Sequence, residues 1–497
     1  MVNKVIFLIL ILFVFFLRFF QVNQFGYFML DEERDAFLVR RMLVDHRPLL
    51  IGGAIPGGIN VGPLFFYISA IPYALSNLNP VGPAYAAALI GFLSVLAVYF
   101  IGRKLFDERT AILATVFSGF SLLNIIYHRP WWPLTMSQLV TMVAYLALLK
   151  LCKGPALQGQ GRALIKWSMI LVGALIVGAQ SDPSTLSLIP LTVIWLWWKR
   201  KQIKLPGKLI VSMIVIFLLA HVTWFAFELR HDFLNTRAAV GLFSNVFKGP
   251  TLADAKVGPS QTLQMTSAML YRLFSPTGSM DVTKQISPAE EFMKPRLEGV
   301  WWPGAWGLLI GIGMYVVYAF KGPALLWQGR ALISIHFLIS LSGILIYTFA
   351  FPGYVHEWMW AFMFPAFFLM MADILFKLFY KARPWVTKAW PLLICIWIVW
   401  QLSLFAHLTN TAGLGAKLKI VQEAQAQIAG RPYELRSDGQ DSLRYGGWRY
   451  LFTLYGNPPV KSYMDYVYQE WLYPKLEEKP EVVLTILNHE NIKTEYK

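Results

Sequence analysis

Apolar segments long enough to cross a membrane recur along the whole chain, and they limit what it can fold into. A spanning helix needs about 20 mostly apolar residues. Eleven runs meet this description: 5–22, 83–102, 110–127, 134–151, 164–180, 184–198, 208–228, 303–320, 331–350, 355–376 and 388–408. Of the 497 residues, 56% are hydrophobic and 14% are charged. A water-soluble domain cannot bury that much apolar surface, so the sequence predicts a polytopic α-helical membrane protein.

The positive charge gathers in short loops between the apolar runs. The formal net charge is +16, and the basic loops are 102–109, 153–166, 199–204, 321–330 and 377–388. Basic loops favour the cytoplasmic side of a membrane, which explains this charge better than nucleic-acid binding does. All five lie on that side if the N-terminus is cytoplasmic and the apolar stretch 62–76 lies along the outer surface instead of crossing. We therefore expect about eleven spans, with the C-terminus outside.

This topology divides the chain into two domains. Residues 1–410 form a transmembrane domain with long outer loops at 23–82 and 229–302. Residues 411–497 have nearly balanced charge, turn signals and a strand-like run at 481–487, which predicts a small extracytoplasmic α+β domain. The two cysteines, Cys152 and Cys395, belong to apolar segments and indicate neither a disulfide framework nor a zinc site.

Four carboxylates follow the first span in the stretch FMLDEERD, residues 28–35. A helix that begins near Leu30 would carry them in its first turn, where acidic side chains suit the helix dipole. This structural explanation is favoured for Glu33 and Asp35. For Asp31 and Glu32 a working role is favoured, because other ionisable residues share their side of the membrane.

The outer ends of the other spans collect a second set of charged and titratable side chains. Ionisable groups at membrane depth are costly and mark functional sites. Arginine binds phosphate in a bidentate manner, and a carboxylate accepts a proton from an attacking hydroxyl. The set therefore suits a phosphate-bearing lipid that meets a hydroxyl acceptor. Its members are His128, Arg129, Asp182, Glu228, Arg230, His231, His356 and Glu357.

Several motifs in this arrangement resemble one family. The acidic pair after the first span, the surface segment that begins GPLFFY, GRKLFDERTA before the third span, and FELRHDFLNTR (227–237) are similar to membrane glycosyltransferases of the GT-C class. More narrowly, the chain resembles the protein O-mannosyltransferase and lipid A aminoarabinose transferase group, which use dolichyl- or undecaprenyl-phosphate sugars. The resemblance covers residues 1–240 and, more loosely, the last four spans and the tail.

The resemblance implies an inverting glycosyltransferase that moves a hexose or pentose from a polyprenyl phosphate to a hydroxyl on a protein, lipid or glycan. Asp31, with Glu32 beside it, would deprotonate the acceptor. Glu228 and Glu357 would contact acceptor or sugar. Residues expected to bind the donor phosphate are His128, Arg129, Arg230, His231 and His356. No Gly-rich loop joins a strand to a helix, so no nucleotide cofactor is expected.

The sequence departs from the family at two outer loops. Many members carry an aspartate after the arginine of the second outer loop, whereas this chain reads HRPWWP. Where a histidine is expected in the next outer loop, QSDPST offers Asp182. Two alternatives stay open: Asp31 and Asp182 share a divalent cation such as Mg²⁺ or Mn²⁺, or no metal is needed.

Two other functions fit the same charged face. A transporter or flippase of a lipid-linked saccharide would use it as a binding vestibule, although transporters place ionisable groups deep within spans and at broken helices. An assembly protein would use the outer tail to dock a partner. The crowding of polar residues at the outer ends of the spans favours the enzyme. The loops favour a prokaryotic plasma membrane with the active site outside.

Overall fold

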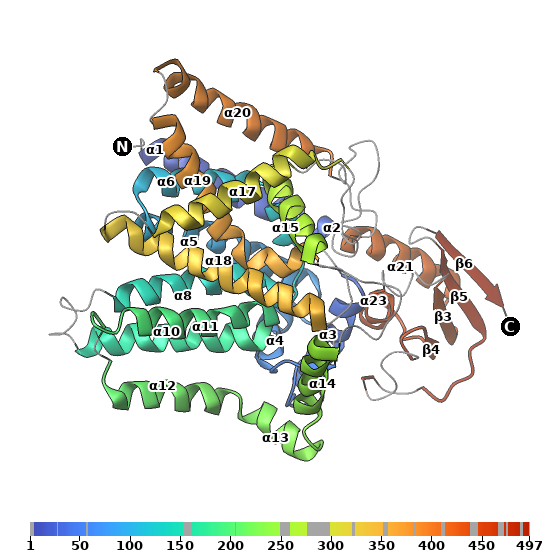
Figure 1. Cartoon of the computed structure of the whole chain (residues 1–497). Helices are drawn as coiled ribbons and strands as arrows, with labels where there is room; N and C mark the ends of the chain where they lie inside the picture. The colour runs from blue at the N-terminus through green and yellow to red at the C-terminus, as the bar shows by residue number, and fades with distance from the viewer. Residues whose placement is uncertain are drawn as a thin grey trace.

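The computed structural model describes the chain except for a few segments. These are residues 1–3, 27, 56–57, 153–160, 204, 249–258, 276–298, 321–323, 351–355, 381–383, 409–412, 438–445, 466–471, 474–475, 488–490 and 497. The described residues form a bundle of helices and a small sheet near the C-terminus (Figure 1).

Helices cover every one of the eleven expected spans. They are α1 (Lys4–Phe19), α5 (Val81–Leu105), α6 (Glu108–Phe120) with α7 (Leu122–Tyr127), α8 (Ser137–Leu151), α10 (Gly161–Ser181), α11 (Leu188–Trp198), α12 (Gly207–Ala220) with α13 (Val222–Arg230), α17 (Trp302–Ala319), α18 (Ala324–Ala350), α19 (Phe364–Tyr380) and α20 (Pro384–Ala406). Short 3₁₀ turns precede three of them: η1 (Pro133–Met136), η2 (Pro183–Ser187) and η3 (Glu357–Met363).

The helices differ in how well each alone suits a membrane. Across the described chain, seven are long and apolar enough to span, and the α12–α13 pair, bent by 53°, makes eight. The remaining expected spans correspond to α1, which has 16 residues, to the broken α6–α7 pair, and to η2 with α11. The chain is therefore a multi-pass membrane protein, and the number eleven remains a prediction.

The break between α6 and α7 shows how an interrupted span is tolerated. At Ser121 the backbone leaves the helix, and the freed groups find partners on other elements. The Ser121 hydroxyl donates to the Leu273 carbonyl at 2.7 Å, and the Leu122 amide donates to Gln401 Oε1 at 2.8 Å. Such replacement bonds are what a lipid environment demands of a broken helix.

The connections sort into two ends of the bundle. Helix α3 (Leu30–Val44), helix α4 (Leu64–Leu75), helix α14 (Leu234–Lys248) and the C-terminal sheet lie at one end, which we call the α3 end (Figure 1). At the opposite end lie the α5–α6 turn (102–109) and the starts of α10, α12, α18 and α20, which flank the other four basic loops in sequence (Figure 1). The charge separation expected from the sequence is therefore built into the fold.

Helix α4 does not cross the bundle, as the sequence predicts for 62–76. At its start, the Leu64 amide donates to Gln180 at the end of α10, 3.3 Å away. Just after it, the Leu78 carbonyl accepts from the Tyr450 hydroxyl of the C-terminal segment at 2.7 Å. Both of its ends therefore contact elements of the α3 end.

The segment 229–302, which the sequence predicts to be an outer loop, is helical in much of its described part, and its side of the membrane stays a prediction. It contains α14 and a further helix, α15 (Pro259–Phe274), which packs against α17 and α18 with Met269, Arg272 and Leu273 buried. Sequence reasoning missed α15 because its serines, threonines and glutamines interrupt the apolar pattern. Several of these polar groups bond within the helix, as Thr266 does to the Thr262 carbonyl.

The C-terminal segment forms a mixed four-stranded sheet in the order β4-β3-β5-β6. Strand β3 (Tyr433–Ser437) pairs in parallel with β4 (Lys461–Ser462) and β5 (Val482–Leu487), and β6 (Asn491–Tyr496) pairs antiparallel to β5. The strand expected at 481–487 is thus confirmed. Helices α21 (Leu414–Ile428) and α23 (Trp448–Tyr455) join this sheet to the bundle.

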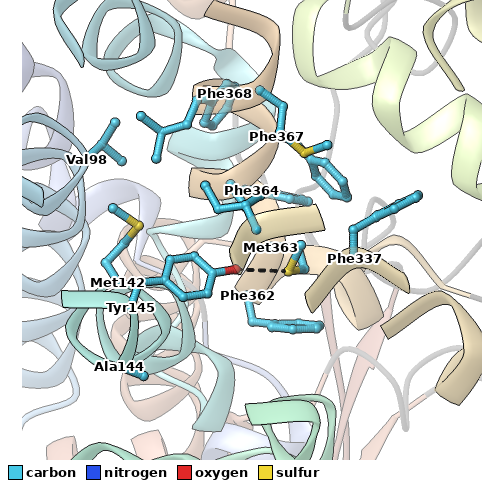
Figure 2. Close-up of a cluster of buried hydrophobic side chains, with 14 of the residues drawn as sticks. Val98, Met142, Ala144, Tyr145, Phe337, Phe362, Met363, Phe364, Phe367 and Phe368 are labelled. Carbon is cyan, nitrogen blue, oxygen red and sulfur yellow. Dashed lines mark hydrogen bonds between the residues drawn. The ribbon is translucent and has the colours of Figure 1, made fainter. Parts of the chain in front are cut away.

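The C-terminal segment shares its apolar core with the membrane-proximal helices. Phe37 of α3 and Tyr73 of α4 belong to the same buried cluster as Tyr450 of α23 and Leu484 of β5. A second and larger core fills the bundle, where Tyr145 of α8 meets the phenylalanine-rich start of α19 (Figure 2). The expected boundary at 410 falls within 409–412, outside the described residues, and stays a prediction.

Candidate functional site

Burial separates the four carboxylates at the start of α3. The side chain of Asp31 is 75% exposed, while Glu32, Glu33 and Asp35 are at most 6% exposed. This difference follows from the helical period, because Asp31 lies on the face that α4 and the C-terminal segment leave uncovered. Asp31 alone among the four presents its carboxylate to the solvent.

Arg34 pairs with both the exposed carboxylate of Asp31 and the buried carboxylate of Asp35. Its guanidinium lies 3.0 Å from Asp31 Oδ1 and 2.7 Å from Asp35 Oδ1. Gly53, beside the hairpin of β1 (Ala54–Ile55) and β2 (Ile59–Asn60), packs against the same guanidinium. Arg34 therefore fixes the first turn of α3 under the hairpin. The ion pair between Arg34 and the exposed Asp31 contributes little to stability.

Glu33 joins α3 to the C-terminal segment, so the expected explanation, that it suits its own helix dipole, is incomplete. Its Oε1 accepts from the Tyr450 amide at 2.8 Å, and its Oε2 accepts from the Gly447 amide at 2.9 Å and the Tyr463 hydroxyl at 2.8 Å. Gly447 immediately precedes α23, and Tyr450 lies in its first turn. The carboxylate therefore caps α23, a helix more than 400 residues away in sequence.

Lys417 of α21 completes this joint from the other side. Its ammonium donates to the Phe28 carbonyl at 2.5 Å and the Gly446 carbonyl at 2.6 Å, and it is fully buried. These contacts flank the first turn of α3 and the first turn of α23. The C-terminal segment thus holds the residues immediately before Asp31.

Glu32 closes the N-terminus of its own helix. Its Oε2 accepts from the Met29 amide at 3.0 Å, an acidic cap at the position where helices favour one. Burial raises the pKa of Glu32 from 4.5 to about 8, and the neighbouring charge of Asp31 adds to this shift. Two adjacent carboxylates thus differ in environment, one exposed to water and one that holds its proton near neutral pH.

We expect Glu32 to make the folded protein less stable as the pH rises. The folded pKa lies above the unfolded value, so the contribution of Glu32 is complete below about pH 4.5 and is lost as the pH rises through about 8. The melting temperature of the wild type in nanodiscs should fall from pH 6 to pH 8 more steeply than that of Glu32→Gln, whose amide still accepts from Met29. Parallel curves for the two proteins would contradict this assignment.

A large cavity lies between η2, α18 and η3. Its volume is about 430 Å³, within the range of pockets for small ligands. Its walls are mostly apolar, with Leu186, Ile344 and Trp358 among them, and polar groups come from Asp182, Ser184 and Ser340. Asp182 Oδ1 also accepts from the Ser184 amide at 2.8 Å, so this carboxylate caps η2 while it lines the cavity.

A hydrogen-bonded chain runs from this cavity into the core. Tyr145 lies 2.6 Å from His336 Nδ1, and Ser187, in the cavity wall, lies 2.9 Å from His336 Nε2. Because the Ser187 hydroxyl donates to the Ser184 carbonyl at 2.7 Å, it must accept from Nε2–H. The tyrosine then donates to Nδ1, in preference to the Met363 sulfur 3.7 Å away (Figure 2). This assignment makes His336 neutral and Ser187 a structural group, not a nucleophile.

His128 and Arg129 are both buried and used within the fold. His128 Nε2 lies 3.2 Å from Gln138 Oε1, and its ring packs against Gly91 of α5, where no side chain would fit. Arg129 donates to the Phe20 carbonyl at 2.7 Å and the Leu17 carbonyl at 3.0 Å, which caps the end of α1. Their expected role on a donor phosphate stays a prediction.

The ionisable residues that follow α12 also differ in burial. Glu228 is buried and accepts from the Asn235 and Thr236 amides, each at 2.9 Å, so it caps α14. Arg230 and His231 are exposed at the turn between α13 and α14. His231 Nδ1 also lies 2.9 Å from the Phe227 carbonyl. The fold occupies Glu228, and the expected contacts of these three residues with donor phosphate, acceptor or sugar stay predictions.

The pair His356–Glu357 begins η3, next to the large cavity. His356 stacks on Trp358, a cavity residue, with ring centroids 5.7 Å apart. Glu357 forms a buried ion pair with Arg272 of α15. Glu357 therefore holds α15 against η3, and its expected acceptor or sugar contact, like the phosphate contact of His356, is not tested by this arrangement.

The shared metal site expected for Asp31 and Asp182 finds no support in the described geometry. Within the described ranges, no group of three or more His, Cys, Asp or Glu side chains is close enough to hold a metal ion. Asp31 pairs with Arg34, and Asp182 bonds to Ser184. Metal dependence stays an open prediction.

The sequence analysis did not predict that four ionisable residues are buried and hold the fold together: Arg18, Arg272, His336 and Lys417. Arg18 and His336 lie inside apolar runs, where an ionisable residue is itself a signal, so both were open to detection. Nothing in the sequence around Arg272 or Lys417 distinguishes them from solvated charges, because their partners lie far away in the chain.

Comparison with solved structures identifies the fold. ArnT from Cupriavidus metallidurans bound to undecaprenyl phosphate matches with a TM-score of 0.54 and 12% identity over 97% of this chain and 92% of ArnT. Its apo state gives 0.53 and 13% over the same shares. The apo oligosaccharyltransferase of Archaeoglobus fulgidus gives 0.51 and 11% over 92% of this chain and 64% of that one. No protein-family model and no curated protein sequence matches.

These matches confirm the fold class that the sequence predicts. The chain is a polytopic helical membrane protein with the GT-C fold of ArnT and the archaeal oligosaccharyltransferase. At 11–13% identity the likeness concerns the fold. Its activity has to be argued from the site.

Proposed function

We propose that this protein is a glycosyltransferase that moves a sugar from a polyprenyl-phosphate donor to a hydroxyl acceptor at the α3 end of the bundle. The observation that carries the proposal is Asp31, the one exposed carboxylate at the start of α3, on the fold of an enzyme whose structure was solved with undecaprenyl phosphate. The large cavity at η2, with apolar walls and few polar groups, suits a lipid-linked sugar.

In the proposed reaction, Asp31 accepts the proton of the acceptor hydroxyl as its oxygen attacks the anomeric carbon. The bond from that carbon to the phosphate oxygen breaks, and the negative charge leaves with the polyprenyl phosphate. Arg230 and His231, both exposed, are available to stabilise this charge. Attack in line with the leaving phosphate inverts the anomeric configuration. No nucleotide is needed at any step.

The basic loops support an orientation in which the opposite end faces the cytoplasm. The α3 end, the cavity and the C-terminal segment 411–497 would then be extracytoplasmic. The donor's sugar would be presented on that side, and its polyprenyl tail would lie along the lipid-exposed spans of the domain 1–410. This orientation places the basic loops on the cytoplasmic side, as expected for a prokaryotic plasma membrane.

The test is sugar transfer by the purified protein in nanodiscs. We expect radiolabel to move from at least one polyprenyl-phosphate hexose or pentose to a hydroxyl acceptor, with release of polyprenyl phosphate and inverted product by NMR. The matching nucleotide sugars should give no transfer. If no donor reacts while the protein moves labelled lipid-linked sugar across proteoliposome membranes, the transporter alternative replaces this proposal.

A further inference from the structure

Two buried arginines lie close together without an acidic partner. Among the described residues, five arginines are at most 8% exposed, and three of them have acids: Arg272 pairs with Glu357, Arg330 with Asp373 and Arg449 with Asp465. Arg18 is 1% exposed and Arg129 8%, and no described carboxylate lies within ion-pair distance of either. Arg129 is near enough to act on Arg18 as a like charge.

Backbone carbonyls compensate these two charges only in part. Arg18 donates to the Ser118 carbonyl at 2.7 Å and to the Gly119 carbonyl, at the end of α6. Arg129 caps α1 in the same way. A helix C-terminus carries about half a negative charge, so about one positive charge remains uncompensated in a low-dielectric region.

A small pocket opens beside Arg129. Its volume is about 140 Å³, and the rings of Phe25 and Phe405 each lie 5.9 Å from the Arg129 guanidinium carbon. Ala406, the last residue of α20, forms part of its wall. The pocket is smaller than sites for drug-sized ligands and has room for little more than a phosphate group. It shares no lining residue with the large cavity.

The pocket lies beside helix surfaces that suit the acyl chains of a lipid. It lies where α1 and α20 end, and both helices expose apolar side chains, with Phe16 49% exposed on α1 and Val399 66% exposed on α20. We infer that the pocket binds the phosphate of an anionic membrane phospholipid, whose acyl chains lie along α1 and α20. The lipid supplies the counter-charge that the fold lacks for Arg18 and Arg129. This inference does not depend on the proposed transfer reaction, and it assigns Arg129 to a membrane phospholipid in place of the donor phosphate expected from the sequence.

The experiment blocks the pocket without touching either arginine. Ala406→Trp places an indole in the pocket, and Ser403→Trp, on an exposed position of α20 outside the lining, is the matched control. Native mass spectrometry in detergent with added phosphatidylglycerol should show one bound lipid on the wild type and on Ser403→Trp. Ala406→Trp should bind at least about 10-fold more weakly, and circular dichroism should show all three proteins folded.

Competing lipids and ions decide the identity of the ligand. Phosphatidylglycerol should raise the melting temperature of the wild type but not of Ala406→Trp, because a ligand that binds only the folded state stabilises it. Equal binding of phosphatidylcholine would overturn the anionic preference, and equal binding of inorganic phosphate would overturn the lipid. Displacement by undecaprenyl phosphate at lower concentration would assign the pocket to the donor instead. Unchanged lipid binding by Ala406→Trp would also overturn the inference.

Discussion

Replacement of Asp31 by Asn is expected to reduce sugar transfer at least about 100-fold and to leave the protein folded. A general base contributes roughly 10²–10⁴-fold to the rate of a proton transfer, and the amide cannot take up the acceptor proton. The substitution removes only an exposed ion pair with Arg34, whose other partner, Asp35, remains 2.7 Å away. Transfer from the best polyprenyl-phosphate donor, at matched protein in nanodiscs, measures the effect.

The control for this variant is Asp45→Asn, an exposed carboxylate at the other end of the same helix. It changes the charge of α3 by the same amount and should keep transfer within about twofold of the wild type. Donor binding should survive in Asp31→Asn, so that kcat falls and KM changes little. Near wild-type transfer by Asp31→Asn would show that this carboxylate is only part of the helix start and would withdraw it as the base.

The helical architecture was predictable because a membrane helix can be recognised from the length and apolarity of its sequence. Every expected span has a helix, and the segment 62–76, which the charge of the loops predicted not to cross, contains the short helix α4 at the α3 end. The helix α15 was not predictable in this way. Its Thr266 and Ser267 hydroxyls bond within the helix, and its arginine is neutralised by Glu357, which is 85 residues away in sequence.

The site could be predicted as a face of the molecule but not residue by residue. Sequence position brings acidic and basic side chains to the outer ends of spans, and it does not say which of them the fold occupies. Arg129 caps the end of α1, far away in sequence, and Glu228 caps the start of the nearby α14. Asp31 and Arg230, in contrast, stay exposed. A carboxylate that caps a helix and one that takes a proton look alike until their hydrogen-bond donors are known.

Glu33→Gln is expected to loosen the C-terminal segment from α3 and to lower the free energy of unfolding by about 1–3 kcal/mol, the cost of leaving a buried hydrogen-bonding group without its partner. The carboxylate accepts from three donors on two oxygens, and an amide offers one oxygen and an NH₂ group that points at the remaining donors. Lys417, fully buried, would also lose the nearby acid that favours its charged form. The melting temperature in nanodiscs and the rate of proteolysis of the C-terminal segment measure the loss.

Glu495→Gln provides the matched control, because it makes the same chemical change in the same segment. Glu495 forms an exposed pair with Lys493 on β6, at 2.7 Å with both side chains more than half exposed, so its loss should leave the melting temperature almost unchanged. Since Lys417 and Glu33 hold the residues on either side of Asp31, Glu33→Gln should also reduce transfer at temperatures where the protein is still folded. If it melts and reacts like Glu495→Gln, the C-terminal segment is held by its apolar core alone, and Asp31 owes its position to α4 and Arg34.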